Sequence, residues 1–140
     1  MFTDMDVCRK ILHQLKELLA LAGKLVFAVD TVANRRPDDS DYKPGISVTT
    51  KEGFRLTLKS RNYYDEQSQT QFSPGIYELY RDAELLQSEP MDFQTHLYKL
   101  GELEPYLKEI GFRSITTYSS FQKEIAVGNQ SEMFLYECVL

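Results

Sequence analysis

The fold is decided by a short apolar run at residues 25–29, which reads Leu25-Val26-Phe27-Ala28-Val29. The run has no polar residue and so lacks the alternation that is typical of a strand with one wet face. Strands of this kind are usually covered on both faces, as in the middle of a parallel sheet. The run therefore predicts a buried strand, and replacing its central Phe27 by alanine is expected to cost about 3–5 kcal/mol of stability.

The run follows a predicted helix over residues 4–21. Its apolar positions recur at helical spacing, at Cys8, Ile11, Leu12, Leu15, Leu18 and Leu19. Thr3 is the expected N-cap, Phe2 and Val7 can form a hydrophobic staple, and Gly23 is the expected stop.

Residues 45–98 are rich in strand-forming residues and predict an antiparallel meander. The expected strands cover residues 46–50, 54–64, 69–81 and 85–97. Ser73-Pro74-Gly75 should interrupt the third of them, because proline cannot donate to a ladder.

A short helix is expected over residues 100–110, ended by Gly111. Two antiparallel strands follow, over residues 113–118 and 133–139. The predicted fold class is α+β, with an N-terminal helix, a buried strand, a meander, a short helix and a C-terminal antiparallel strand pair. We expect a single domain over residues 1–140, divided into residues 1–32, 45–98 and 99–140.

Composition excludes several classes of function. The 140 residues carry 16 Lys and Arg against 21 Asp and Glu, a net charge of −5, whereas nucleic-acid-binding proteins usually show a basic patch. No apolar run approaches the ~20 residues of a membrane span, and the first residues do not resemble a signal peptide. With two cysteines that fit a core, a cytoplasmic protein that binds neither nucleic acid nor membrane is expected.

Three segments, taken in order, resemble the C-terminal half of the class I S-adenosylmethionine-dependent methyltransferases. Residues 11–27 resemble the helix, turn and fifth strand of that fold, with Leu21-Ala22-Gly23 where the family has Pro-Gly-Gly. Residues 98–112, which end in Gly111-Phe112, resemble the late helix that leads to the sixth strand. Residues 132–138 stand where the antiparallel seventh strand would lie. The resemblance implies a partial Rossmann-like sheet, with the meander as a substrate-side insertion.

The resemblance also implies S-adenosylmethionine as the cofactor of the complete family fold. The family holds it with a glycine-rich turn and an acidic residue in its N-terminal half, and this sequence has no Gly-x-Gly. No cofactor-binding residue is therefore assigned. The chain would be a fragment, one piece of a split enzyme or a retained binding module, inactive alone. The apolar strand would be covered by the meander folding back over it, by a missing N-terminal half or by a second copy of the chain. We expect the second copy, and therefore a homodimer or larger oligomer, unless the meander or the missing half covers the strand.

Six residues are candidates for a substrate-side site that accepts a small molecule. Asp30 and Thr31 end the apolar strand, and ligands often bind at the carboxyl ends of strands in open α/β sheets. His96 and Tyr98 precede the late helix, where the resembled family can face its substrate. Arg61 and Tyr63 alternate along the end of a meander strand.

No catalytic residue and no metal ligand is assigned. Ligands with zinc spacing are missing, no serine lies in a nucleophile motif, and Glu102 and Glu104 are interpreted as solvated carboxylates. The leading interpretation is the substrate-side part of a methyltransferase-like protein, and whether the chain is an enzyme stays open. The alternatives are a non-enzymatic α+β interaction module that dimerises through an exposed strand edge, and a small-ligand-binding domain.

Overall fold

The computed structural model describes residues 3–140 and divides them into two compact units. The framing unit comprises residues 3–35 and 96–140, and the insertion unit comprises residues 36–95. The chain leaves the framing unit after Arg35 and returns to it at His96. The expectation of a single domain over residues 1–140 stays a prediction.

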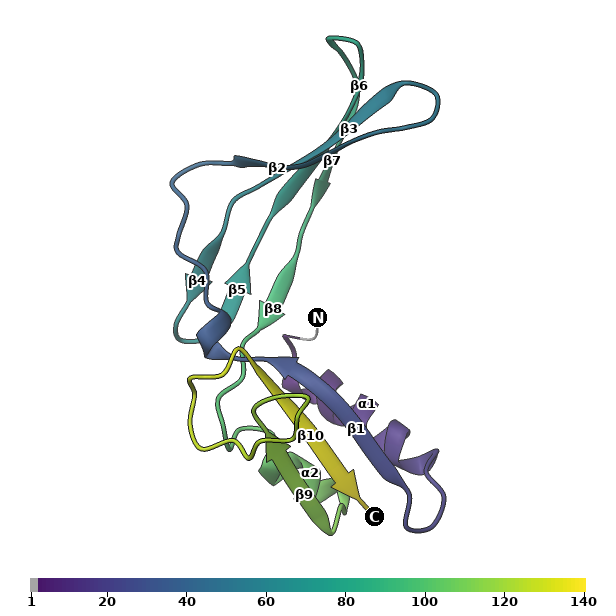
Figure 1. The fold of residues 1–140 in the computed structure, drawn as a ribbon, viewed down its shortest axis with the longest axis vertical. Helices are drawn as coiled ribbons and strands as arrows, with labels where there is room; N and C mark the ends of the chain where they lie inside the picture. The colour runs from purple at the N-terminus through teal and green to yellow at the C-terminus, as the bar shows by residue number, and fades with distance from the viewer. Residues whose placement is uncertain (1–2) are drawn as a thin grey trace. The chain divides into compact units, whose positions relative to one another are not determined.

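The framing unit contains two helices, a 3₁₀ turn and one three-stranded antiparallel sheet. Its elements are α1 (Met5–Glu17), β1 (Lys24–Asp30), η1 (Val32–Asn34), α2 (Glu104–Ile110), β9 (Ser114–Tyr118) and β10 (Met133–Val139). The sheet order is β1-β10-β9, so that β10 lies between the other two strands, as Figure 1 shows. The predicted N-terminal helix, short second helix and closing antiparallel pair are confirmed.

Helix α1 begins one residue later than the sequence indicated, because Asp4 is its N-cap. The Asp4 carboxylate accepts hydrogen bonds from the backbone N–H groups of Asp6 at 2.9 Å and Val7 at 3.3 Å. Predicting Thr3 as the cap was therefore wrong, and the staple through Phe2 lies outside the described residues. The helix ends at Glu17 rather than at residue 21.

One face of the framing sheet forms the core. Phe134, Tyr136 and Cys138 alternate along β10 and are fully buried. Leu12 of α1 and Leu107 of α2 pack in the same cluster, so both helices cover this one face.

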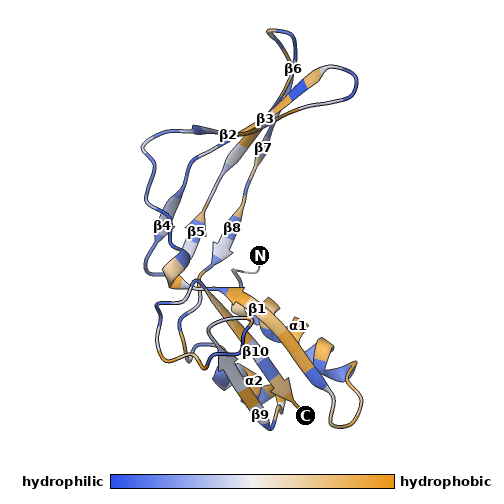
Figure 2. Cartoon of the chain, viewed as in Figure 1, coloured by the Kyte–Doolittle hydropathy of each residue, from blue (hydrophilic) through white to orange (hydrophobic). Residues whose placement is uncertain are grey.

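The prediction that β1 is covered on both faces was wrong. Figure 2 shows β1 largely in orange, yet its side chains alternate between half-buried and exposed positions, and Val26 is 50% exposed. The strand pairs with β10 on one side and is an edge strand of the described sheet. With both helices on the opposite face, nothing in the framing unit covers Val26 and Ala28, which accounts for their exposure.

This arrangement lowers the expected cost of the Phe27→Ala substitution. Phe27 is half-buried, and its ring stacks on Tyr136 with centroids 5.2 Å apart. Because only part of the ring loses contacts, we expect a loss of about 1–3 kcal/mol, measured by denaturant unfolding. Val26→Ala on the exposed face is the matched control and should change stability by less than about 0.5 kcal/mol.

The insertion unit is a β structure with two sheets. Its strands are β2 (Lys43–Thr49), β3 (Phe54–Ser60), β4 (Tyr63–Asp65), β5 (Thr70–Phe72), β6 (Gly75–Arg81), β7 (Glu84–Met91) and β8 (Gln94–His96), the last of which runs into the framing unit. The order β2-β3-β6-β7 forms one sheet, and β4-β5-β8 forms another. The antiparallel meander is confirmed, but each of its three long predicted strands is broken in two. The break between β5 and β6 falls at Ser73-Pro74, as expected from the proline, which cannot donate a hydrogen bond to a ladder.

A polar clamp holds the segment before β2 against the start of β4. The Asp39 carboxylate accepts hydrogen bonds from the backbone and side-chain nitrogens of Asn62, both at 3.0 Å, and pairs with Lys43 at 2.5 Å. These contacts lower the pKa of Asp39 to about 2, with the Lys43 hydrogen bond as the largest cause. The clamp is therefore intact at neutral pH and is lost only as the pH falls through about 2.

Candidate functional site

Four of the six candidate residues come together at the carboxyl end of β1, and we call this group the strand-end site. It consists of Asp30, Thr31, His96 and Tyr98, all in the framing unit. Thr31 and Tyr98 form a parallel β-bridge. The Tyr98 N–H donates to the Asp30 carbonyl at 2.9 Å, and the Val32 N–H donates to the Tyr98 carbonyl at 3.1 Å. Backbone hydrogen bonds thus join two segments that are 66 or more residues apart in the sequence.

The side chain of Thr31 fastens the strand end to the loop before β10. Thr31 is fully buried, and its hydroxyl donates to the Ser131 carbonyl while accepting from the Ala33 N–H at 3.2 Å. Beside it, the Asp30 carboxylate accepts from the Asn34 side-chain amide at 3.2 Å. Thr31 is therefore a structural residue of this site, and the half-buried Asp30 is its more accessible member.

His96 is held by a carboxylate and an aromatic ring. Its Nε2 lies 2.5 Å from Oε1 of Glu102, and its ring meets Tyr98 edge-on with centroids 4.6 Å apart. The other Glu102 oxygen accepts from the Lys99 N–H at 3.0 Å. An imidazole oriented by a carboxylate is suited to accept a proton from a bound group, provided that the group reaches the ring.

Tyr98 closes the site toward α1. Its hydroxyl lies 3.8 Å from Sγ of Cys8, and only 3% of the residue is exposed. Burial, with smaller contributions from Cys8 and Glu102, raises the pKa of Tyr98 far above its usual value. The phenol is therefore a neutral hydrogen-bonding group at any physiological pH.

Arg61 and Tyr63 belong to the insertion unit and not to the unit that holds the strand-end site. The Arg61 guanidinium lies over the Tyr63 ring, 5.4 Å from its centroid, and that ring stacks on Phe72 at 4.8 Å. The two residues do not share a strand, because Arg61 lies in the break between β3 and β4 and Tyr63 is the first residue of β4. Their role in binding a substrate stays a prediction, as do the roles of the other four.

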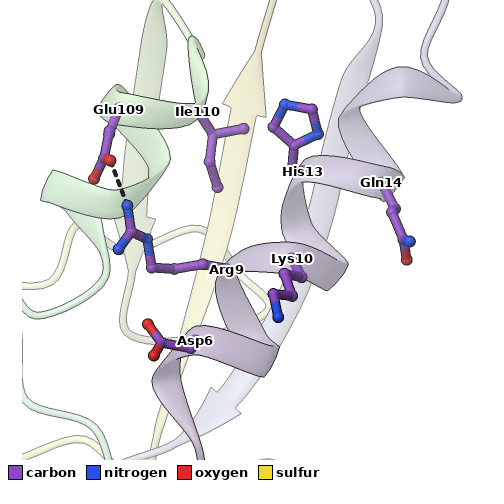
Figure 3. A pocket seen from close by; sticks show the side chains of 7 residues that line it. All are labelled: Asp6, Arg9, Lys10, His13, Gln14, Glu109 and Ile110. Atoms are coloured by element: carbon purple, nitrogen blue, oxygen red, sulfur yellow. Dashed lines mark hydrogen bonds and ion pairs between the residues drawn. The ribbon is translucent and has the colours of Figure 1, made fainter.

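A separate groove of about 540 Å³ lies between the two helices of the framing unit (Figure 3). It is lined by Asp6, Arg9, Lys10, His13, Gln14, Glu109 and Ile110. Figure 3 shows Arg9 of α1 reaching Glu109 of α2, and this ion pair crosses the groove. The groove holds none of the six candidate residues.

Two carboxylates near the second helix, Glu102 and Glu104, make contacts that the prediction of solvated side chains did not include. Glu102 is not simply solvated, because it binds His96 and the Lys99 N–H. Glu104 accepts from the Thr117 hydroxyl at 2.8 Å, and its second oxygen is buried with no partner among residues 3–140. The signal for Glu102 was its place three residues after Lys99, where a carboxylate can bond back to the backbone.

Two classes of feature are missing from residues 3–140. No group of three or more His, Cys, Asp and Glu side chains is arranged to hold a metal ion. None of the described helices has the length and apolar character that crossing a lipid bilayer requires.

Comparison with solved structures identifies the fold. The chain is similar to the CcbJ methyltransferase of Streptomyces caelestis, with a TM-score of 0.61 and 15% identity, over 98% of this chain and 54% of that one. It is also similar to an S-adenosylmethionine-dependent methyltransferase of Clostridium acetobutylicum, with a TM-score of 0.66 and 15% identity, over 98% of this chain and 52% of that one. The fold is therefore methyltransferase-like, and the chain spans about half the length of each of these proteins.

Sequence comparison gives a different relative. Over 114 residues the chain is 26% identical to the pantothenate synthetase of Thermodesulfovibrio yellowstonii. The matched region covers 78% of this chain and 40% of that protein. No protein-family model matches the chain.

Proposed function

We propose that this chain is the C-terminal, substrate-side part of an S-adenosylmethionine-dependent methyltransferase-like protein. The observation that carries the proposal is the position of β1, an edge strand with one exposed face whose carboxyl end leads into the strand-end site. In a complete fold of this kind, a neighbouring parallel strand would pair with that edge and bring the cofactor-binding half with it. The half-length match to methyltransferases supports this division.

In this proposal the strand-end site shapes the pocket for the methyl acceptor. Methyl transfer needs an acceptor atom aligned with the donor methyl group, so positioning supplies much of the catalysis. Asp30 would bind a polar group of the acceptor, and His96, oriented by Glu102, would take a proton from the attacking atom. S-adenosylmethionine would supply the methyl group from the other half of the fold.

The chain alone is expected to bind S-adenosylmethionine no more tightly than about 1 mM, the weak end of useful affinity. The reason is that its sequence has no Gly-x-Gly turn to bind the cofactor. Isothermal titration calorimetry with the purified chain measures this affinity, and a micromolar dissociation constant would contradict the division of roles.

The acceptor side can be tested by NMR, because the chain has only two histidines. We expect small amines and hydroxyl compounds, titrated as a fragment set, to shift the imidazole signals of His96. The matched control is His13 in the groove between the helices, whose signals should stay in place. Fragments that shift only His13, or no fragment that shifts His96, would argue against an acceptor pocket here.

Two alternatives have observations of their own. An interaction module that dimerises through the β1 edge is favoured by the exposure of Val26 beside that unpaired edge. A part in pantothenate synthesis is favoured by the sequence likeness to a pantothenate synthetase. Dissociation of a dimer by Val26→Glu would establish the interaction module. Pantothenate formation by the purified chain would establish a part in pantothenate synthesis.

A further inference from the structure

A hollow of about 430 Å³ lies within the insertion unit, over one face of the sheet β2-β3-β6-β7. The side chains of β3 and β6 that line it make this face polar, and they are Arg55, Lys59, Glu78 and Tyr80. Small-molecule sites usually have volumes of about 300–1,000 Å³. The hollow is therefore large enough for a small organic ligand.

A bulge in β2 forms one wall of the hollow. The register of β2 against β3 shifts between residues 44 and 47, so that two residues of β2 stand opposite one residue of β3. Glycine at position 45 allows this close approach, because a Cβ there would lie 3.0 Å from the carbonyl oxygen of Leu58. Bulges are over-represented next to functional sites. This wall adds apolar surface from Tyr42, Pro44 and Ile46.

The floor of the hollow is an ordered chain of contacts. Nζ of Lys59 lies 2.8 Å from Oε1 of Glu78, and the Tyr80 hydroxyl donates to the other oxygen of that carboxylate at 2.9 Å. The hydrogen bond from Lys59, with a smaller contribution from Tyr80, lowers the pKa of Glu78, so the carboxylate is ionised at neutral pH. Both oxygens of Glu78 are therefore occupied, and its charge is matched by Lys59.

Arg55 carries a positive charge that no carboxylate matches. Its guanidinium lies over the Tyr80 ring, 4.8 Å from the centroid, and this contact leaves its N–H donors unused. Its neighbours on the same face are Thr49 across from it on β2, Tyr80 across from it on β6, and Thr57 along β3, none of them acidic. Among residues 3–140 the Arg55 guanidinium has no hydrogen bond and no ion pair. The ring thus positions a cation whose donors are open to a ligand.

The charges that line the hollow leave one positive charge over. Arg55 and Lys59 are the cations and Glu78 is the anion. Asp41 acts on Lys59 more weakly than Glu78 does, and it does not line the hollow. A ligand with a single negative charge therefore completes the balance without separating Lys59 from Glu78.

We propose that this hollow binds a small monocarboxylate, with its carboxylate on Arg55 and its apolar body against Tyr42 and Ile46. The guanidinium donates two parallel N–H hydrogen bonds to the carboxylate, the pairing for which its planar fork is suited. A phosphate monoester fits less well, because it carries a charge of about −1.5 to −2 at pH 7 and Lys59 is already paired. The site lies wholly within the insertion unit and does not depend on S-adenosylmethionine or on the strand-end site.

The test is an NMR titration of the isotope-labelled full chain with sodium benzoate, which joins a carboxylate to an apolar ring. We expect saturable shifts of the Arg55 side-chain N–H and of the backbone N–H groups of Gly45 and Ser47, with a Kd of about 1 mM or tighter. Benzamide has a similar shape without the charge and should bind about 10-fold more weakly. Equal binding of benzamide, or no saturable shift up to about 20 mM benzoate, would overturn the proposal.

Two arginines of the same sheet give a matched pair of variants. Arg55→Gln should abolish benzoate binding with an unchanged circular dichroism spectrum, and Arg81→Gln should leave the binding unchanged. Arg81 also lies over an aromatic ring, that of Phe54 at 4.9 Å, but on the opposite face of the sheet. An equal loss of affinity in both variants would overturn the assignment to Arg55, because it would show a general effect of charge.

Thr49→Glu tests the site while Arg55 stays in place. Thr49 stands directly opposite Arg55, so the new carboxylate pairs with the guanidinium from within the chain and supports the pairing of β2 with β3. We expect the affinity for benzoate to fall about 10-fold while thermal stability is maintained. An unchanged affinity would overturn the proposal. So would phenyl phosphate binding about 10-fold more tightly than benzoate, because the hollow would then be a phosphate site.

Discussion

Replacing Phe134 by alanine is expected to cost about 3–5 kcal/mol of folding free energy, the usual range for a buried phenylalanine. Phe134 is fully buried on β10, the central strand of the framing sheet, and packs in the cluster that joins both helices to that sheet. Its removal leaves a cavity that the surrounding backbone, which is paired with Val29 of β1, cannot easily close. Equilibrium unfolding in urea measures the loss.

The matched control is Phe121→Ala, because Phe121 is 70% exposed and lies outside the core cluster. That substitution should change stability by less than about 0.5 kcal/mol. A loss below about 1 kcal/mol for Phe134→Ala would show that β10 is not the centre of the core.

The Cys138 thiol is expected to resist alkylation in the folded protein by a factor on the order of 1,000 at pH 8, because the reactive species is the thiolate. Cys138 is fully buried, and this burial, assisted by Glu104 and Glu137, raises its pKa to about 12. A raised thiol pKa disfavours the thiolate, so the protection persists throughout the neutral range and decreases only as the pH approaches 12.

The experiment uses a Cys8→Ala variant, in which Cys138 is the only remaining cysteine. Iodoacetamide labelling is followed by mass spectrometry in buffer and in concentrated guanidinium chloride. Comparable rates in the two conditions would show that β10 opens readily and that the thiol is not held in the core.

The sequence predicted the bounds and breaks of individual strands best where they depend on a local residue pattern. The strand at residues 133–139 has the predicted bounds, and the break at Ser73-Pro74 follows from the missing proline donor. The burial of β1 was not predictable in this way. An unbroken apolar run shows that a strand could be buried on both faces. Whether Val26 is in fact buried depends on which other elements pack against that face, and here it is exposed.

The residues of the strand-end site could be predicted from the sequence, but the contacts between them could not. Asp30, Thr31, His96 and Tyr98 were each singled out, and their proximity depends on a parallel bridge between Thr31 and Tyr98 that no local pattern encodes. Glu102 was missed for a different reason: its contact with His96 spans only six residues, and it forms because residues 96–102 fold back on themselves.

The bridge between Thr31 and Tyr98 also bears on how a protein of this kind can change during evolution. It ties together, within the framing unit, the segments just outside the points where residues 36–95 begin and end. When the chain segments on both sides of an insertion are already hydrogen-bonded to each other, the insertion can be lengthened, shortened or exchanged without unfolding the unit that carries it. Selection can therefore vary the insertion as a cassette, while the scaffold that carries His96 and Glu102 keeps its geometry.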